Sequence, residues 1–161
     1  MSGKSAISLA AADDTLAFGA CLGRACRGGD LILLAGELGG GKTTLTRGIA
    51  RGLGVAEATP ITSPTFNIVH EYRGRLELFH FDLYRLSGED ELYEIGFDDY
   101  LERNGVTVIE WPDRLGSLVP EEHLSITMEY SPDLVSRLAK LTPHGSTWLK
   151  RTAELSREFT P

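Results

Sequence analysis

The chain has 161 residues, and its 16 Lys and Arg against 23 Asp and Glu give a formal net charge of −7 at pH 7. With 42% hydrophobic residues, this length predicts one domain over residues 1–161 that needs no disulfide or metal to fold. No apolar run approaches the roughly 20 residues of a membrane span, no export signal is visible, and no basic stripe suits a nucleic acid. We therefore expect a cytoplasmic protein that neither enters a membrane nor binds nucleic acid on its own.

The first third of the chain predicts a helix, a strand, a glycine loop and a second helix. Apolar residues have helical spacing between Asp13 and Gly28. The continuous apolar run 31–35 has strand length and suits a sheet that is covered on both faces. Apolar residues four apart over 43–53 predict a helix directly after the glycine loop.

The remainder predicts a loop over 60–66, which holds two prolines, and then an antiparallel hairpin over 67–82. Further predicted elements are a helix over 89–103, strands over 106–109 and 124–130, and helices over 133–141 and 146–158. Helices that alternate with buried strands indicate a three-layer α/β fold, and the hairpin makes its mainly parallel central sheet mixed.

The segment from Gly36 to Thr43 matches G-x-x-x-x-G-K-[ST], the phosphate-binding loop, or P-loop. Glycines let successive backbone N–H groups turn toward an anion. Lys42 adds a positive charge for the β- and γ-phosphates, and the Thr43 hydroxyl can bind Mg²⁺. Because a strand precedes this loop and a helix follows it, we predict a P-loop NTPase fold.

Two carboxylates that end predicted strands are candidates for the metal and for the attacking water. Glu110 ends the apolar strand 106–109, where this fold class places an acidic metal residue. Asp82 ends the other well-defined strand and could hold the metal or orient the water. The two residues could also exchange these roles.

The loop Ser63-Pro64-Thr65-Phe66 lies where a switch-like segment after the P-loop helix could reach the γ-phosphate. Its hydroxyl groups would sense that phosphate, whereas the alternative is an ordinary turn held by a rigid proline. The four histidines have no metal-ligand spacing, so we interpret them as structural.

Four strings in order, GELGGGKTT, SPTF, HFDLYRL and IEWPDR, resemble the TsaE family of bacterial ATPases, also known as the YjeE type. The resemblance covers roughly residues 13–130. It implies a small ATPase that helps to form N6-threonylcarbamoyl on adenosine 37 of ANN-decoding tRNAs. Its implied partner is the TsaD–TsaB heterodimer, and it would meet tRNA only through that complex.

The resemblance also implies roles for individual residues, with ATP and Mg²⁺ as cofactors. Thr43 and Glu110 would bind the metal, and Asp82 would act in hydrolysis, with Lys42 and Glu110 as the other catalytic residues. The implied nucleotide-binding residues are Gly36, Glu37, Leu38, Gly39, Gly40, Gly41, Lys42, Thr43, Thr44 and Trp111. Gly40 departs from the alanine that is common in the family, a sterically mild change.

Two other functions fit a P-loop. A small-molecule kinase would use Asp82 to activate an acceptor hydroxyl, although the chain has no clear arginine-rich lid. A nucleotide-dependent binding module would keep Lys42 and Thr43 without turnover. Residues 131–161 match no motif of the family, and Arg85 or a partner could supply a stimulating arginine.

Overall fold

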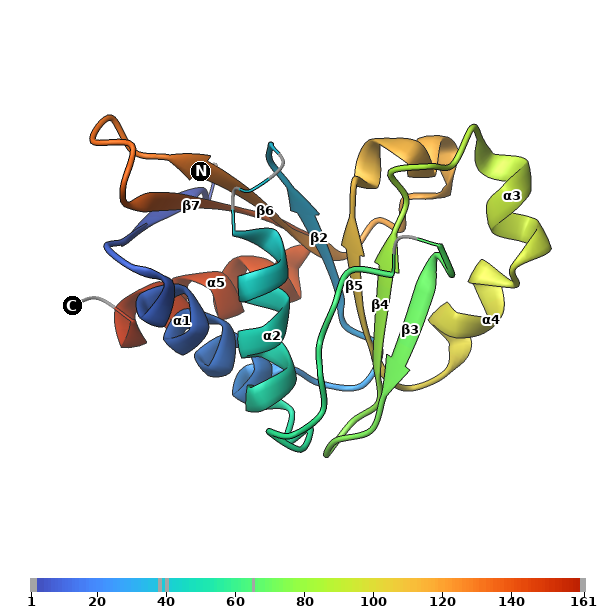
Figure 1. The fold of residues 1–161 in the computed structure, drawn as a ribbon, viewed down its shortest axis with the longest axis horizontal. Helices are drawn as coiled ribbons and strands as arrows, with labels where there is room; N and C mark the ends of the chain where they lie inside the picture. The colour runs from blue at the N-terminus through green and yellow to red at the C-terminus, as the bar shows by residue number, and fades with distance from the viewer. Residues whose placement is uncertain (1–2, 38, 40, 65, 160–161) are drawn as a thin grey trace.

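The computed structural model describes residues 3–37, 39, 41–64 and 66–159. Its strands form one seven-stranded sheet in the order β1-β7-β6-β2-β5-β4-β3 (Figure 1). Parallel pairs join β6, β2, β5 and β4, and antiparallel pairs extend both edges, so the predicted mixed sheet is confirmed. The strands are β1 Ser5–Leu9, β2 Leu31–Ala35, β3 Val69–Tyr72, β4 Leu78–Asp82, β5 Val106–Glu110, β6 His123–Tyr130 and β7 Arg137–His144.

Helices cover both faces of the sheet and give the predicted three layers. One core contains Phe18 of α1, Leu45 of α2 and Trp148 of α5. The core on the other face contains Leu92 of α3 and Phe97 of α4. Figure 1 shows α1, α2 and α5 grouped on one side of the molecule and α3 and α4 on the other. The helices are α1 Ala12–Ala25, α2 Lys42–Gly52, α3 Glu89–Glu94, α4 Phe97–Glu102, the 3₁₀ helix η1 Pro112–Leu118 and α5 Ser146–Glu158.

Glycines bring α1 and α2 into backbone-to-backbone contact. A Cβ atom at Gly48 would lie 2.5 Å from the carbonyl oxygen of Leu16, and one at Gly19 would lie 2.6 Å from that of Leu45. Neither backbone can move without shifting a whole helix. This packing holds the helix whose first turn carries the P-loop lysine and threonine.

The predicted helix over 89–103 is two short helices rather than one. Gly96 lies between them with a φ of 76°, which is left-handed backbone that glycine adopts without strain. The break lets Leu92 and Phe97, one from each helix, enter the same core.

The predicted helix over 133–141 is wrong, because most of this segment belongs to β7. Ala139 and Leu141 are buried while Lys140 is exposed, which is the two-residue period of a strand. The antiparallel partner strand β1 was not predicted either, although Ile7 and Leu9 are buried with the same period. The helix predicted over 146–158 is confirmed as α5, and it packs against the sheet through Trp148 and Leu155.

None of the described helices is both long enough and apolar enough to span a bilayer.

Candidate functional site

The P-loop connects β2 to α2, as the sequence predicts. Gly36, Gly39 and Gly41 have φ values of 134°, 79° and 99°, a region that side chains rarely occupy. A Cβ atom at Gly36 would collide with the carbonyl oxygen of Met128 on β6. The loop can therefore follow this path only with glycine at its first position. Three predicted site residues lie outside the described part of the chain: Leu38, Gly40 and Thr65.

Lys42 begins α2 and turns back across the loop. Its ammonium donates a hydrogen bond to the carbonyl oxygen of Gly36 at 2.6 Å and lies 3.9 Å from the centre of the Trp111 ring. The residue is 5% exposed, and burial lowers the pKa of Lys42, although the carboxylate of Glu110 opposes this shift. A cation held against a ring and one carbonyl can exchange these partners for phosphate oxygens.

A chain of hydrogen bonds joins the predicted metal residues. The Thr43 and Ser63 hydroxyl oxygens are 2.9 Å apart, and the Ser63 hydroxyl donates to Oε2 of Glu110 at 3.4 Å. Nε2 of His80 lies 2.7 Å from the same Oε2. The structure thus brings together α2, the switch-like loop, the middle of β4 and the end of β5. Hydroxyl and carboxylate oxygens are hard donors, so this set fits Mg²⁺.

Asp82 lies beside this chain of hydrogen bonds. In the parallel pairing of β4 and β5, Asp82 is opposite Glu110, which places both residues at the same sheet edge. Its Oδ1 accepts the backbone N–H of Tyr84 at 3.0 Å. Burial raises the pKa of Asp82, the Tyr84 hydrogen bond lowers it, and the charge of Glu110 raises it further.

Aromatic side chains lie next to Lys42 and in the switch-like loop. Trp111 has a φ of 60° and a ψ of 54°, and its ring centre lies 5.0 Å from that of Tyr84. In the switch-like loop Pro64 is buried, whereas Phe66 is 82% exposed. The guanidinium of Arg85 lies 4.7 Å from the centre of the Phe66 ring.

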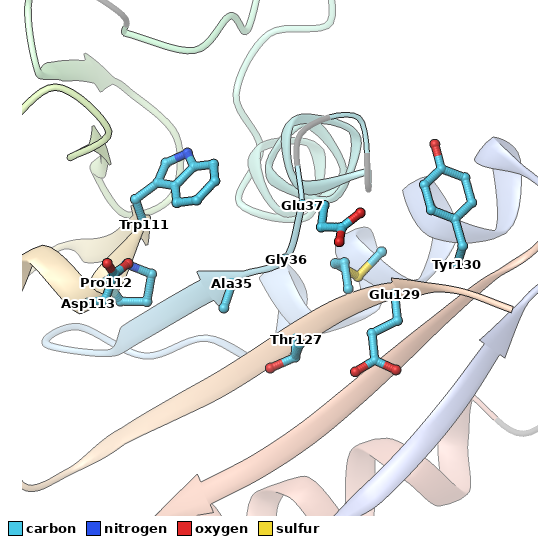
Figure 2. Close-up of a pocket in the computed structure, with 10 residues that line it drawn as sticks. Ala35, Gly36, Glu37, Trp111, Pro112, Asp113, Thr127, Glu129 and Tyr130 are labelled. Atoms are coloured by element: carbon cyan, nitrogen blue, oxygen red, sulfur yellow. The ribbon is translucent and has the colours of Figure 1, made fainter.

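Two cavities flank the P-loop. The larger, of about 610 Å³, lies between the first loop residues, Trp111 and β6 (Figure 2). Figure 2 shows Trp111 on one side of this region and Tyr130 on the other, with Glu37 between them. The smaller, of about 90 Å³, is lined by residues that include Thr44 and Arg137. The larger cavity includes the first residues of the P-loop, whereas Lys42 and Thr43 are not among its lining residues in the described chain.

Comparison with protein families identifies one match over most of the chain. The sequence model of the family described as "Threonylcarbamoyl adenosine biosynthesis protein TsaE" matches residues 9–138. The chain belongs to the TsaE family. The match includes the P-loop, the switch-like loop and both carboxylates, so the resemblance inferred from the four sequence strings is confirmed.

Individual TsaE proteins are similar over most of their length. The protein "tRNA threonylcarbamoyladenosine biosynthesis protein TsaE" of Treponema pallidum is 40% identical over 76% of this chain and 89% of its own. The Nostoc protein with the same description is 40% identical over 88% of this chain and 87% of its own. A crystal structure of Bacillus subtilis YdiB has a TM-score of 0.80 and 32% identity, and the match covers 98% of this chain and 97% of that one. The similarity of fold therefore includes β7 and α5, which the sequence strings do not reach.

Three residues of this TsaE-family site were missed from the sequence. His80 was interpreted as structural, yet it contacts Glu110. The alternation of β4 could have indicated this, because His80 and Asp82 are two residues apart and share a face. Tyr130 and Arg137 both donate hydrogen bonds to the carbonyl oxygen of Gly39, at 3.1 and 3.5 Å. No local pattern marks these two: Tyr130 ends the predicted strand 124–130, and Arg137 lies in the segment that was predicted as a helix.

Proposed function

We propose that this TsaE-family protein is a cytoplasmic, Mg²⁺-dependent ATPase that serves the threonylcarbamoyl modification of adenosine 37 in ANN-decoding tRNAs. It would act on the TsaD–TsaB heterodimer and meet tRNA only through that complex, which suits its net charge of −7. Residues 1–161 would work as one ATPase domain. The observation that carries the proposal is the hydrogen-bonded chain from Thr43 through Ser63 to Glu110 at the end of the P-loop.

In this proposal the P-loop holds the phosphates. Backbone N–H groups at the start of α2 would face the anion, and Lys42 would leave the carbonyl oxygen of Gly36 to pair with the β- and γ-phosphates. Trp111 would line the place that the ammonium vacates. A lysine whose charged form is disfavoured by burial gains most from a phosphate partner, because the phosphate charge replaces lost solvation.

The two carboxylates would have different roles. Thr43 and Glu110 would hold Mg²⁺, which neutralises phosphate charge when it is bound. Asp82 would orient the attacking water. Its Oδ1 accepts the Tyr84 N–H, its Oδ2 accepts no hydrogen bond from the described residues, and its raised pKa favours accepting a proton. Ser63 lies between Thr43 and Glu110 and would rearrange when the γ-phosphate arrives, as expected of a switch residue.

The test is ATP hydrolysis by the purified chain, alone and with the TsaD–TsaB pair, with Lys42→Ala as the control. We expect slow turnover alone, because an arginine that stabilises the transition state can come from a partner. The pair should stimulate hydrolysis, and the control should abolish the stimulation. Tight ATP binding without stimulated turnover would contradict the proposal and favour a binding module. Phosphate transfer to a small acceptor would favour a kinase.

A further inference from the structure

Glu110 is a buried carboxylate whose orientation is controlled by its neighbours. The residue is 3% exposed, and both hydrogen bonds of its carboxylate to described residues end on Oε2. The Ser63 contact at 3.4 Å is long, whereas the His80 contact at 2.7 Å is short. His80 is therefore the main hydrogen-bond partner that fixes the orientation of the carboxylate.

The surroundings of His80 indicate where its proton lies. The side chain is fully buried, and Nδ1 has no hydrogen-bond partner among the described residues. A proton on Nδ1 alone would leave a buried N–H unpaired and would turn the bare Nε2 toward a carboxylate oxygen. A proton on Nε2 satisfies both the ring and Glu110. The favoured form is thus the one in which Nε2–H donates to Oε2.

We propose that His80 is a positioning residue for Glu110. Its Nε2–H donates to Oε2 and holds the carboxylate in one orientation, in which it is available to the Mg²⁺ of the bound nucleotide. The inference rests on the proposed function, in which Glu110 serves the metal. Hydrogen-bond partners of this kind typically change metal affinity about 10- to 100-fold when they are removed.

Two substitutions separate positioning from space filling. His80→Phe keeps an aromatic ring of similar size in a buried strand but removes the donor. His80→Gln keeps an N–H donor at a similar reach. If His80 only filled space, Phe would replace it at least as well as Gln.

The measurement is nucleotide affinity in Mg²⁺ and in EDTA, together with the Tm of each protein without nucleotide. We expect His80→Phe to lose about 10- to 100-fold of the affinity gained from Mg²⁺, with little change in EDTA, and His80→Gln to keep most of the gain. A full gain in His80→Phe, or equal losses in both variants, would overturn the inference. If the unsubstituted protein gained nothing from Mg²⁺, the proposed function would fail first, and the inference with it.

A second measurement uses the unsubstituted protein and does not depend on whether a variant folds. Long-range ¹H–¹⁵N correlation NMR distinguishes the protonated nitrogen of each histidine ring, and the His80→Gln spectrum assigns the His80 signals. We expect a proton on Nε2 without nucleotide or metal. A ring that carries its proton on Nδ1 and none on Nε2 would overturn the inference.

Discussion

Replacing Asp82 by asparagine tests the division of labour between the two carboxylates. The substitution keeps the side-chain volume and an Oδ1 that can still accept the Tyr84 N–H. In the unsubstituted protein the Tyr84 nitrogen lies 3.0 Å from Oδ1 of Asp82. Because burial raises the pKa of Asp82, its charged form costs folding free energy at neutral pH. Asparagine removes that cost, so we expect an equal or higher Tm. A loss of activity would then not reflect a loss of fold.

The expected effect of Asp82→Asn is on hydrolysis and not on binding. Proton transfer by a positioned group contributes about 10²- to 10⁴-fold, or roughly 3–5 kcal/mol of barrier. We expect kcat to fall by that factor in the presence of TsaD–TsaB, with the nucleotide Kd nearly unchanged. In the unsubstituted protein, kcat should fall as the pH drops through the raised pKa of Asp82, because the ionised form is the active one.

The assay is a coupled measurement of ADP release across pH 5–8, with the nucleotide Kd determined in parallel for both proteins. Turnover by Asp82→Asn within a few fold of the parent would refute the role of Asp82 in hydrolysis. A large rise in Kd with unchanged kcat would instead make Asp82 the metal ligand and leave the water to Glu110.

Three other outcomes are expected. Lys42→Ala should weaken ATP binding about 10- to 100-fold, measured by calorimetry, because it removes a charge-assisted hydrogen bond. An unchanged Kd would contradict the role of Lys42 in phosphate binding. Glu110→Gln should lose affinity in Mg²⁺ but not in EDTA, and equal losses would remove it from the metal site. Gly48→Ala should cost about 1–3 kcal/mol and lower Tm by several degrees, because its Cβ would lie 2.5 Å from a helix carbonyl oxygen. Gly88→Ala, with open space around it, is the matched control, and equal Tm values would refute the close packing of α1 and α2.

The elements that the sequence predicts well are those with a strong local signal. The P-loop is recognisable because a buried strand, a glycine loop and a helix follow one another within residues 31–53. Glu110 and Asp82 were placed at strand ends by the apolar runs before them, and their register as opposite residues of β4 and β5 follows from parallel pairing. To predict that Asp82 and Glu110 are neighbours, the sequence analysis lacked only the strand order β2-β5-β4.

The break at Gly96 and strand β7 show the limit of such signals. An isolated glycine within a helical pattern can be tolerated or can end a helix. Here the helix ends, because the break at Gly96 lets Leu92 and Phe97 pack in the same core. Over 133–141, the short apolar runs fit the period of a helix as well as that of a strand. The segment forms a strand because it pairs with β1 and β6. Both decisions depend on contacts with distant segments.

The same limit explains why part of the site was missed. Because β6 pairs with β2, the end of β6 lies next to the start of the P-loop. Tyr130, the last residue of β6, thereby donates to the carbonyl oxygen of Gly39, and Arg137, the first residue of β7, donates to the same atom. The Arg137 guanidinium also lies 3.8 Å from the centre of the Tyr130 ring, so the two residues support each other. The P-loop is thus held in place by the β6–β7 hairpin, and we expect a change in that hairpin to reach the proposed phosphate site through Gly39.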